Sequence, residues 1–203
     1  MTTRADLRSE LRNRLHDAGA AIWEDEELNG YIEQAVKSLY PHWYLFETGT
    51  ETAGPGPVQS LPIGLSGDIA KNLHYVGLRK PTSTRVRTIR GWQEGNGQVM
   101  VPKVDDAVEG FILVFAWTIP HRAPDDDVTD LTIPANAEEV VVLRSQVTAL
   151  ERVLADRVKS AKYFAVQVRE GVSEQDIAVT LDALHASIDS RMKDAPGPPE
   201  RVG

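Results

Sequence analysis

Apolar residues recur every three or four positions near both ends of the chain, and this spacing predicts helices there. The first helix begins at Thr3 and Asp6, which have the spacing of a capping box, and it ends near Gly19. Its apolar face comprises Leu7, Leu11 and Leu15.

A second helix follows the acidic run that begins directly after Trp23. With Glu24 as N-cap, Trp23 and Leu28 have the positions of a hydrophobic staple, and Glu27 lies in the first turn. Asp25 is an alternative N-cap, because glutamate caps a helix poorly. The predicted buried face comprises Leu28, Ile32, Ala35, Val36 and Leu39.

Two further helices are predicted near the C-terminus. One begins at a box formed by Asn136 and Glu139, continues unbroken to about Glu170 and ends at Gly171. Its apolar positions are Val140, Leu143, Val147, Leu150, Leu154, Val158, Ala161, Ala165 and Val168. The other begins at the capping box of Ser173 and Asp176 and ends near Lys193. Its apolar face comprises Ile177, Leu181, Leu184, Ile188 and Met192.

The middle of the chain predicts strands, because helix-breaking glycine and proline residues separate short apolar runs there. The candidates are Val58–Ile63, Leu73–Lys80, Thr84–Trp92, Gln98–Pro102 and Phe111–Ile119. The run Glu94–Gly97 is typical of a hairpin turn. Phe111–Ile119 is apolar on both faces, so we expect it to be the most central strand.

These elements predict an α+β fold. The terminal helix pairs carry apolar faces that neither pair could bury alone, so we expect one helical bundle with an antiparallel β region inserted into it. The predicted boundaries are 1–47 for the first helices, 48–133 for the β domain, 134–193 for the last helices and 194–203 for an extended, proline-rich tail.

Composition and charge argue against several classes of function. A formal net charge of −8 argues against a general DNA-binding domain, which is normally basic. The absence of cysteine excludes disulfides, thiolate zinc sites and a cysteine nucleophile. No apolar run reaches the ~18 residues of a membrane span, and the N-terminus lacks the apolar core of a signal peptide. We therefore expect no membrane contact and a protein assembled in a cytoplasm.

No catalytic constellation is recognisable. The five histidines are scattered, no phosphate-binding loop is present, and Gly64–Gly67 misses the nucleophile-elbow pattern. The acidic run Asp125–Asp130 fails the calcium-loop pattern at its sixth and twelfth positions, so a solvated acidic loop is the favoured interpretation and a weak Ca²⁺ or Mg²⁺ contact the alternative. We expect neither an enzyme nor a protein with a cofactor or structural metal.

One basic segment is unusual in so acidic a chain. It contains no acidic residue, and its cations are Arg79, Lys80, Arg85, Arg87 and Arg90. The favoured interpretations are a charge-protected strand edge or a protein interface. The alternative is a nucleic-acid contact, which would make the chain a nucleic-acid-binding regulatory protein.

The stretch GAAIWEDEELNGYIEQAVKSLYP resembles the N-terminal signature of head-to-tail adaptor (connector) proteins of tailed bacteriophages. The matching residues are Trp23, Asp25, Glu27, Leu28, Tyr31, Ile32 and Ala35. Later stretches are similar in order to the family's strands and last helices: LPIGLSGDI, GWQEGNGQVMVP, EEVVVLRSQVTALERVL and YFAVQVREGVSEQDIAV. Glu24 departs from the pattern, since serine or threonine would cap better.

The resemblance implies a structural virion protein of the neck. Such proteins form a ring, usually of twelve copies, beneath the portal, where they extend the DNA channel and contact a stopper or tail-completion protein. DNA would pass through without specific binding, which the acidic charge favours. The C-terminal segment of the family docks onto the portal, so Arg201 and Val202 join the basic segment as candidate interface residues.

Overall fold

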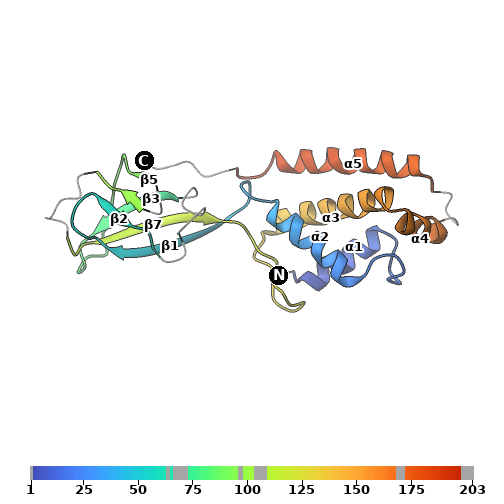
Figure 1. Ribbon diagram of the computed structural model, residues 1–203, viewed down its shortest axis with the longest axis horizontal. Coiled ribbons are helices and arrows are strands. Elements are labelled where there is room, and N and C mark those ends of the chain that lie inside the picture. The colour runs from blue at the N-terminus through green and yellow to red at the C-terminus, as the bar shows by residue number, and fades with distance from the viewer. Residues whose placement is uncertain are drawn as a thin grey trace. The chain divides into compact units, whose positions relative to one another are not determined.

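The computed structural model describes residues 2–62, 65, 73–95, 98–102, 109–167 and 172–197 (Figure 1). The chain combines helices with antiparallel strands. The helices are α1 (Arg4–Arg14), α2 (Asp25–Lys37), α3 (Ala135–Ala155), α4 (Arg157–Gln167) and α5 (Glu174–Met192). The strands are β1 (Leu45–Thr52), β2 (Val58–Ser60), β3 (Leu73–Arg79), β4 (Arg87–Thr88), β5 (Gln93–Gly95), β6 (Gln98–Met100) and β7 (Ile112–Ile119).

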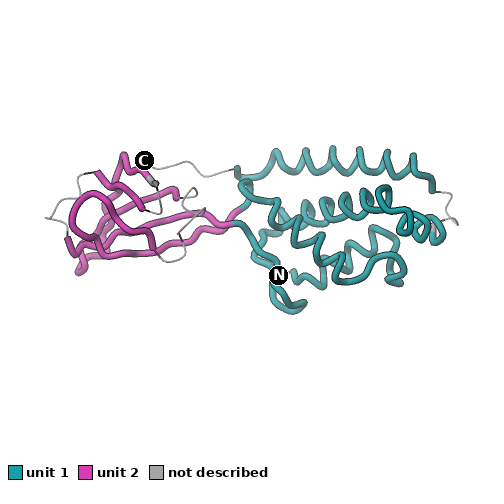
Figure 2. Tube along the Cα trace, in the orientation of Figure 1, with its two compact units in different colours: residues 1–43, 120–197 teal, residues 44–119, 198–203 magenta. Residues whose placement is uncertain are grey.

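The chain divides into two compact units (Figure 2). The helical unit contains residues 1–43 and 120–197, so both parts of the chain that flank the strands contribute to it. The β unit contains residues 44–119. The β region predicted from the sequence has its limits at 48 and 133. In the structure this unit begins four residues earlier, and residues 120–133 belong to the helical unit.

The helical unit has one apolar core with α3 at its centre. Helix α3 contacts α1, α2, α4 and α5, and Val140, Val141, Val142 and Leu143 are all buried along it. Four consecutive buried residues point in all directions around a helix, which indicates neighbours on several sides. The predicted apolar faces of α1 and α2 enter the same core.

Local side-chain chemistry begins α1 and α5. The Thr3 hydroxyl accepts a hydrogen bond from the Asp6 amide at 3.2 Å, and the Asp6 carboxylate accepts one from the Thr3 amide at 2.9 Å. Ser173 and Asp176 form the same capping box before α5. Both predicted boxes are confirmed, and each satisfies two amides that lack partners within the helix.

The other two predicted helix starts differ. Glu24 is the N-cap of α2 without a side-chain hydrogen bond, and Asp25 lies inside the first turn. The box predicted at Asn136 and Glu139 is wrong, because α3 already begins at Ala135 with Pro134 as its N-cap. Proline restricts the residue before it and has no amide to donate, which suits it to a helix start.

The predicted single helix from 136 to 170 is broken at Asp156. This residue has an extended backbone (φ −115°, ψ 110°), and its Oδ1 accepts hydrogen bonds from the amides of Val158 and Lys159 at 2.9 and 3.2 Å. Asp156 therefore ends α3 and caps α4. After the break the predicted apolar face points outward, and its members Val158, Ala161 and Ala165 are exposed. Leu154, in the last turn of α3, is exposed as well. Val168 lies outside the described residues.

The β unit contains two sheets with only antiparallel pairs among its described strands. The larger has the order β1-β7-β3-β4 and the smaller has the order β2-β6-β5. Strand β7 has a neighbour on each side, which confirms the central place predicted for Phe111–Ile119. The two sheets share an apolar core that includes Trp92, Trp117, Phe115 and Val99.

Three strand predictions need correction. Strand β1 was not predicted, and β5 was assigned to the turn that precedes β6. The run Thr84–Trp92 was predicted as one strand, but only Arg87 and Thr88 form β4, at the edge of the larger sheet. Pairing of β5 with β6, with Gly95 opposite Gln98, agrees with the predicted hairpin.

The C-terminal end of α5 continues further than expected. The amides of Asp194 and Ala195 donate hydrogen bonds to the carbonyls of Arg191 and Met192, and Ala195 packs against the helical core. The predicted extended tail from 194 therefore starts with residues that belong to the helical unit. Arg201 and Val202 lie outside the described residues. In the parts of the chain that the structure describes, no helix is long and apolar enough to cross a bilayer.

Candidate interaction surfaces

A buried aspartate, Asp17, organises the turn between α1 and α2. Its side chain is 1% exposed. Its Oδ1 accepts hydrogen bonds from the amides of Ala21 and Ile22 at 2.8 and 3.1 Å, and its Oδ2 accepts one from the Trp23 amide at 3.2 Å. These three bonds fold the turn before α2 and hold Trp23 in the core, where it is fully buried.

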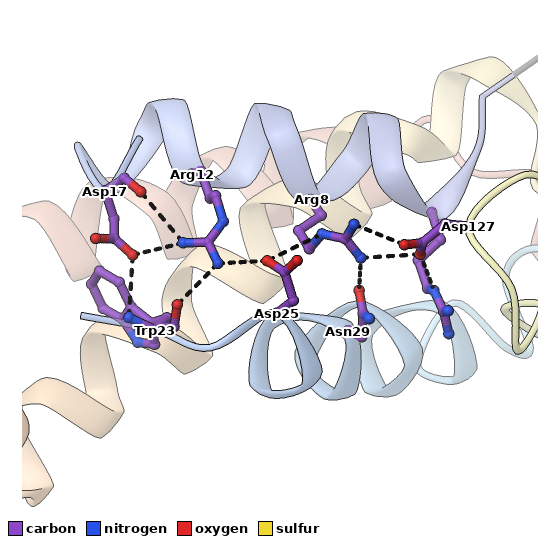
Figure 3. A network of polar contacts seen from close by, with 8 residues as sticks. Arg8, Arg12, Asp17, Trp23, Asp25, Asn29 and Asp127 are labelled. Atoms are coloured by element: carbon purple, nitrogen blue, oxygen red, sulfur yellow. Dashed lines mark hydrogen bonds and ion pairs between the residues drawn. The ribbon is translucent and has the colours of Figure 1, made fainter. Parts of the chain in front are cut away.

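Arg12 joins this turn to the start of α2. Its Nη1 donates to Asp17 Oδ2 at 2.9 Å, and its Nη2 donates to the Trp23 carbonyl at 2.9 Å and to Asp25 Oδ1 at 2.6 Å (Figure 3). A guanidinium group is suited to this role because its planar fork presents several donors at once. The Arg12 side chain is only 11% exposed, so its bond to Asp17 forms away from water, whereas the bond to Asp25 lies at the surface.

Arg8 and Arg4 connect α1 to the acidic loop. Figure 3 shows Arg8 between Asn29 of α2 and Asp127; the Arg8 guanidinium donates to both Asp127 oxygens at 3.0 and 2.8 Å. Arg4 Nε donates to Asp127 Oδ1 at 3.0 Å, and Arg4 Nη2 donates to the Asp125 carbonyl at 2.6 Å. The run Asp125–Asp130 is therefore tied to a helix rather than solely solvated, which corrects the favoured interpretation from sequence.

The arginines lower the pKa values of their acidic partners. Hydrogen bonds from Arg8 and then Arg4 lower the pKa of Asp127 to about 2. The hydrogen bond from Arg12 lowers the pKa of Asp25. Asp126 instead accepts bonds from the Thr129 side chain and amide and from the Val128 amide, which lower its pKa. Each effect stabilises the ionised carboxylate.

Glu27 and Tyr31, from the stretch that resembles the adaptor signature, connect α2 to α4. Lys159 donates to both carboxylate oxygens of Glu27, and the Tyr31 hydroxyl donates to Oε1 at 2.5 Å. Burial opposes ionisation of Glu27, but the bonds from Lys159 and Tyr31 outweigh it and lower the pKa of this carboxyl. Burial and the Glu27 carboxylate raise the pKa of Tyr31.

The apolar members of the signature are core residues. Leu28 and Ile32 are fully buried and Ala35 is nearly so. The Trp23 ring lies edge-on to Tyr163 of α4, with the ring centroids 5.9 Å apart. The signature is thus a set of packing positions that joins α2 to α1, α3 and α4. It leaves Asp25 as the most exposed of the seven residues, and even this carboxylate is held by Arg12.

The basic segment lies at one edge of the larger sheet. Lys80, Arg85, Arg87 and Arg90 are exposed, whereas Arg79 is half-buried and donates from Nη1 to the Ser83 carbonyl at 3.1 Å. Within the described ranges, none of the five cations forms an ion pair with a carboxylate. Their charge is therefore available to a partner.

An apolar hollow of about 550 Å³ accompanies this edge. Leu78, Val86 and Phe111 supply its apolar side chains, and Arg85 and Arg87 are among the basic residues around them. An apolar floor with a charged rim is the usual anatomy of a protein interface. The sequence indicated the cations but not the hollow, because Phe111 is distant from Val86 along the chain.

The described residues bear on the metal and histidine sites considered from the sequence. No group of three His, Asp or Glu side chains there could hold a metal ion. His121 is buried rather than at the surface, which lowers its pKa, and its Nδ1 lies 3.1 Å from Thr132 Oγ1. This contact between a histidine and a hydroxyl lacks the third, orienting group of a catalytic triad.

Comparison with known proteins adds no relative. No protein-family model matches the chain, and no curated protein matches its sequence.

Proposed function

We propose that this protein is a head-to-tail adaptor of a tailed bacteriophage, a structural virion protein of the neck. In this proposal the terminal helix pairs form a bundle, and the inserted β unit supplies further contacts. About twelve copies form a ring under the portal, extend the DNA channel and join the capsid to the stopper or tail-completion protein. The protein acts through its interfaces and catalyses no reaction.

The family signature carries the proposal. Trp23, Leu28, Ile32 and Ala35 are buried where α2 meets its neighbouring helices. Glu27 accepts hydrogen bonds from Tyr31 and from Lys159 of α4. A motif whose residues serve packing is what a structural adaptor requires. The net charge of −8 supports the same function, because DNA slides past an acidic surface without adhering.

Electron microscopy tests this function. The purified protein is mixed with the portal protein of the same phage, and particles are imaged with and without the portal. We expect rings of about twelve copies on the portal and a monomeric or weakly associated protein in its absence, because the apolar faces of the helices are used within the helical core. A protein that never binds the portal would exclude the adaptor function.

The C-terminal segment is a proposed portal contact through Arg201 and Val202. Ala195 packs against the helical core, so the test removes only residues 198–203 and leaves that packing intact. We expect loss of portal binding with an unchanged melting temperature. Unchanged portal binding by the truncated protein would exclude this contact while leaving the adaptor function in place.

The second candidate is a nucleic-acid-binding regulator, which the exposed cations of the basic segment favour. It requires binding of DNA by the free protein, with an affinity that falls steeply as salt is raised. Fluorescence anisotropy with a labelled duplex measures this. Arg85→Glu combined with Arg87→Glu would abolish such binding, whereas the adaptor function expects no binding by the original protein either.

A further inference from the structure

The two edges of the larger sheet carry opposite charges. Strand β1 forms one edge and β4 the other. Strand β1 contains Glu47 and Glu51 and no basic residue, whereas Arg85, Arg87 and Arg90 lie in or beside β4. Among the described residues neither glutamate forms an ion pair, and the same holds for the three arginines. The edges are therefore complementary to each other.

Two of the three arginines, Arg85 and Arg87, lie on the same face of the sheet as the glutamates. Glu47 and Glu51 of β1 are opposite Trp117 and Leu113 of β7. Leu113 is opposite Leu78 of β3, which is opposite Arg87 of β4. Residues directly opposite one another in neighbouring strands share a face. Arg87 therefore projects from the face that carries both glutamates. Arg85 lies two residues before Arg87, so it projects from the same face when the segment before β4 pairs as a strand.

Strand direction permits the edges to meet. The pairs β1–β7, β7–β3 and β3–β4 are all antiparallel, so β1 and β4 run in opposite directions. A second copy that continues the sheet in the same orientation places its β1 antiparallel to β4 of the first. This arrangement keeps the glutamate face of one copy on the same side as the arginine face of the other.

The backbone groups at the two edges also match. The Ile89 amide donates to the Val76 carbonyl at 2.9 Å, so the backbone groups of Ile89 face β3. Because these groups alternate in direction along a strand, the amides and carbonyls of Thr88 and Arg90 point away from the sheet. The Ala53 amide donates to the Phe111 carbonyl at 2.7 Å. By the same alternation, the amides and carbonyls of Thr48 and of every second residue from it in β1 point away from the sheet. In the described residues these outward groups have no strand partner.

We propose that copies of this chain join edge to edge, with β1 of one copy added as an antiparallel strand to β4 of the next. Placing Thr48 opposite Thr88 brings Glu51 opposite Arg85. Arg87 then lies opposite Gly49, diagonal to both glutamates, which long side chains can reach. Phe46, 60% exposed in β1, lies opposite Arg90, where a guanidinium can stack on an aromatic ring.

Such a contact is heterologous, because each copy offers a different edge to each neighbour. Heterologous contacts close into a ring when the rotation between copies permits it. The inference rests on the proposed function for this closure, and it names the surfaces that neighbouring subunits use. An uncovered strand edge exposes backbone groups that invite pairing, and charge on both edges selects the complementary one.

Cysteine cross-linking tests the contact, because the chain has no cysteine of its own. A tagged Thr48→Cys protein is mixed with an untagged Thr88→Cys protein and oxidised. We expect a covalent heterodimer, and a ladder of oligomers from the double variant. Thr52→Cys replaces Thr48→Cys as a matched control: it lies on the same strand but about 13 Å away along it, beyond the reach of a disulfide.

The charges are tested in the same assay. Glu47→Lys with Glu51→Lys is added to the Thr48→Cys protein, and Arg85→Glu with Arg87→Glu to the Thr88→Cys protein. Each reversed protein should lose at least tenfold in cross-linking to the unreversed partner, and mixing the two reversed proteins should restore it. Equal cross-linking of Thr48→Cys and Thr52→Cys, cross-linking within one variant alone, or no heterodimer at all would overturn the proposal.

Imaging with the portal separates this inference from the function on which it rests. Rings formed on the portal by the Glu47→Lys, Glu51→Lys protein as readily as by the original chain would overturn the edge contact and leave the adaptor function standing. A specific heterodimer from a protein that never binds the portal would support the edge contact and exclude the adaptor function. Circular dichroism of every variant checks that the fold is intact.

Discussion

Arg12 and Asp17 form an ion pair at 2.9 Å in the turn that precedes α2, and their side chains are 11% and 1% exposed. Asp17 also accepts the amides of Ala21, Ile22 and Trp23. A carboxylate with this number of donors is stable away from water, but only while the donors remain. The turn therefore depends on the Asp17 side chain.

Replacement of Asp17 by alanine tests this dependence. The change leaves the Arg12 guanidinium without a partner at its buried side and frees three amides, so we expect a loss of about 3–5 kcal/mol in the free energy of unfolding. Urea denaturation followed by circular dichroism measures it. Glu10→Ala removes the exposed Glu10–Arg14 pair of the same helix and should cost less than about 0.5 kcal/mol. Similar losses for both variants would contradict the central role of Asp17.

Asp127 should make the stability of the helical unit depend on acid pH. Its pKa is about 2 in the folded protein against an ordinary value of 3.8, so the folded state favours the ionised form. The corresponding stabilisation is complete above about pH 4 and is lost as the pH falls from 4 toward 2. Asp127→Asn lacks this contribution.

The measurement is the difference in melting temperature between the original protein and Asp127→Asn as a function of pH. The difference should be constant from pH 7 to about pH 5 and should shrink between pH 4 and 2. A difference that persists unchanged at pH 2 would show that the Arg4 and Arg8 contacts do not act through the charge of Asp127.

Asp156 should be required for the helical start of α4. Its Oδ1 accepts two amides, and loss of an N-cap of this kind costs about 0.5–2 kcal/mol. We expect Asp156→Ala to lower stability by this amount and Asp156→Asn, which retains the acceptor oxygen, to lower it much less. Thermal unfolding followed at 222 nm compares the three proteins. Equal stability of all three would mean that tertiary packing alone positions α4.

The helix starts at Thr3 and Ser173 could be predicted because a capping box is a bond between residues three apart. The break at Asp156 could not, since the apolar spacing continues through it in the sequence and an aspartate within a helix is common enough. Only the packing of Tyr163 against Trp23 shows that α4 has a different direction from α3. The exposure of Val158, at 68%, follows from that turn.

The strands differ in the same way. The buried strand β7 was predicted from its apolar residues, whereas β1 was missed because its exposed edge selects threonine and glutamate instead of an apolar alternation. An edge strand is paired on one side only, so its residue types are determined mostly by contact with solvent and with partner molecules. This is also why the functional residues of an edge are difficult to predict from periodicity.

The candidate contacts were predicted only in part. The spacing of Arg4, Arg8 and Arg12 by four residues places them on one face of α1, which was a usable signal. Asp127, the partner of Arg4 and Arg8, lies 119 residues from Arg8, and no local rule connects the two. Asp17 gave no signal at all, because a single aspartate in a short turn is ordinary in composition.

Gly30 should be a site where stability can be increased. It lies exposed in the interior of α2, and a Cβ added there would meet no atom within 4 Å. Alanine loses less backbone freedom than glycine when a helix forms, so Gly30→Ala should stabilise the protein by about 0.5–1 kcal/mol. Urea denaturation should show a higher midpoint with an unchanged slope. A lower midpoint would indicate that Gly30 is needed for a contact outside the helical core.

Gly49 should respond in the opposite direction, because β1 passes closely over a tryptophan. A Cβ at Gly49 would lie 2.9 Å from Cη2 of Trp117 and 3.1 Å from Cβ of Pro62. Both neighbours belong to packed parts of the β unit and cannot move freely, so Gly49→Ala should cost about 1–3 kcal/mol. Gly54→Ala is the matched control, since its nearest neighbour, the flexible Gln59 side chain, is 3.8 Å away. Urea unfolding followed by circular dichroism measures the change. A Gly49→Ala protein as stable as the Gly54→Ala protein would show that Trp117 shifts without loss, and that the close approach of β1 does not constrain the edge.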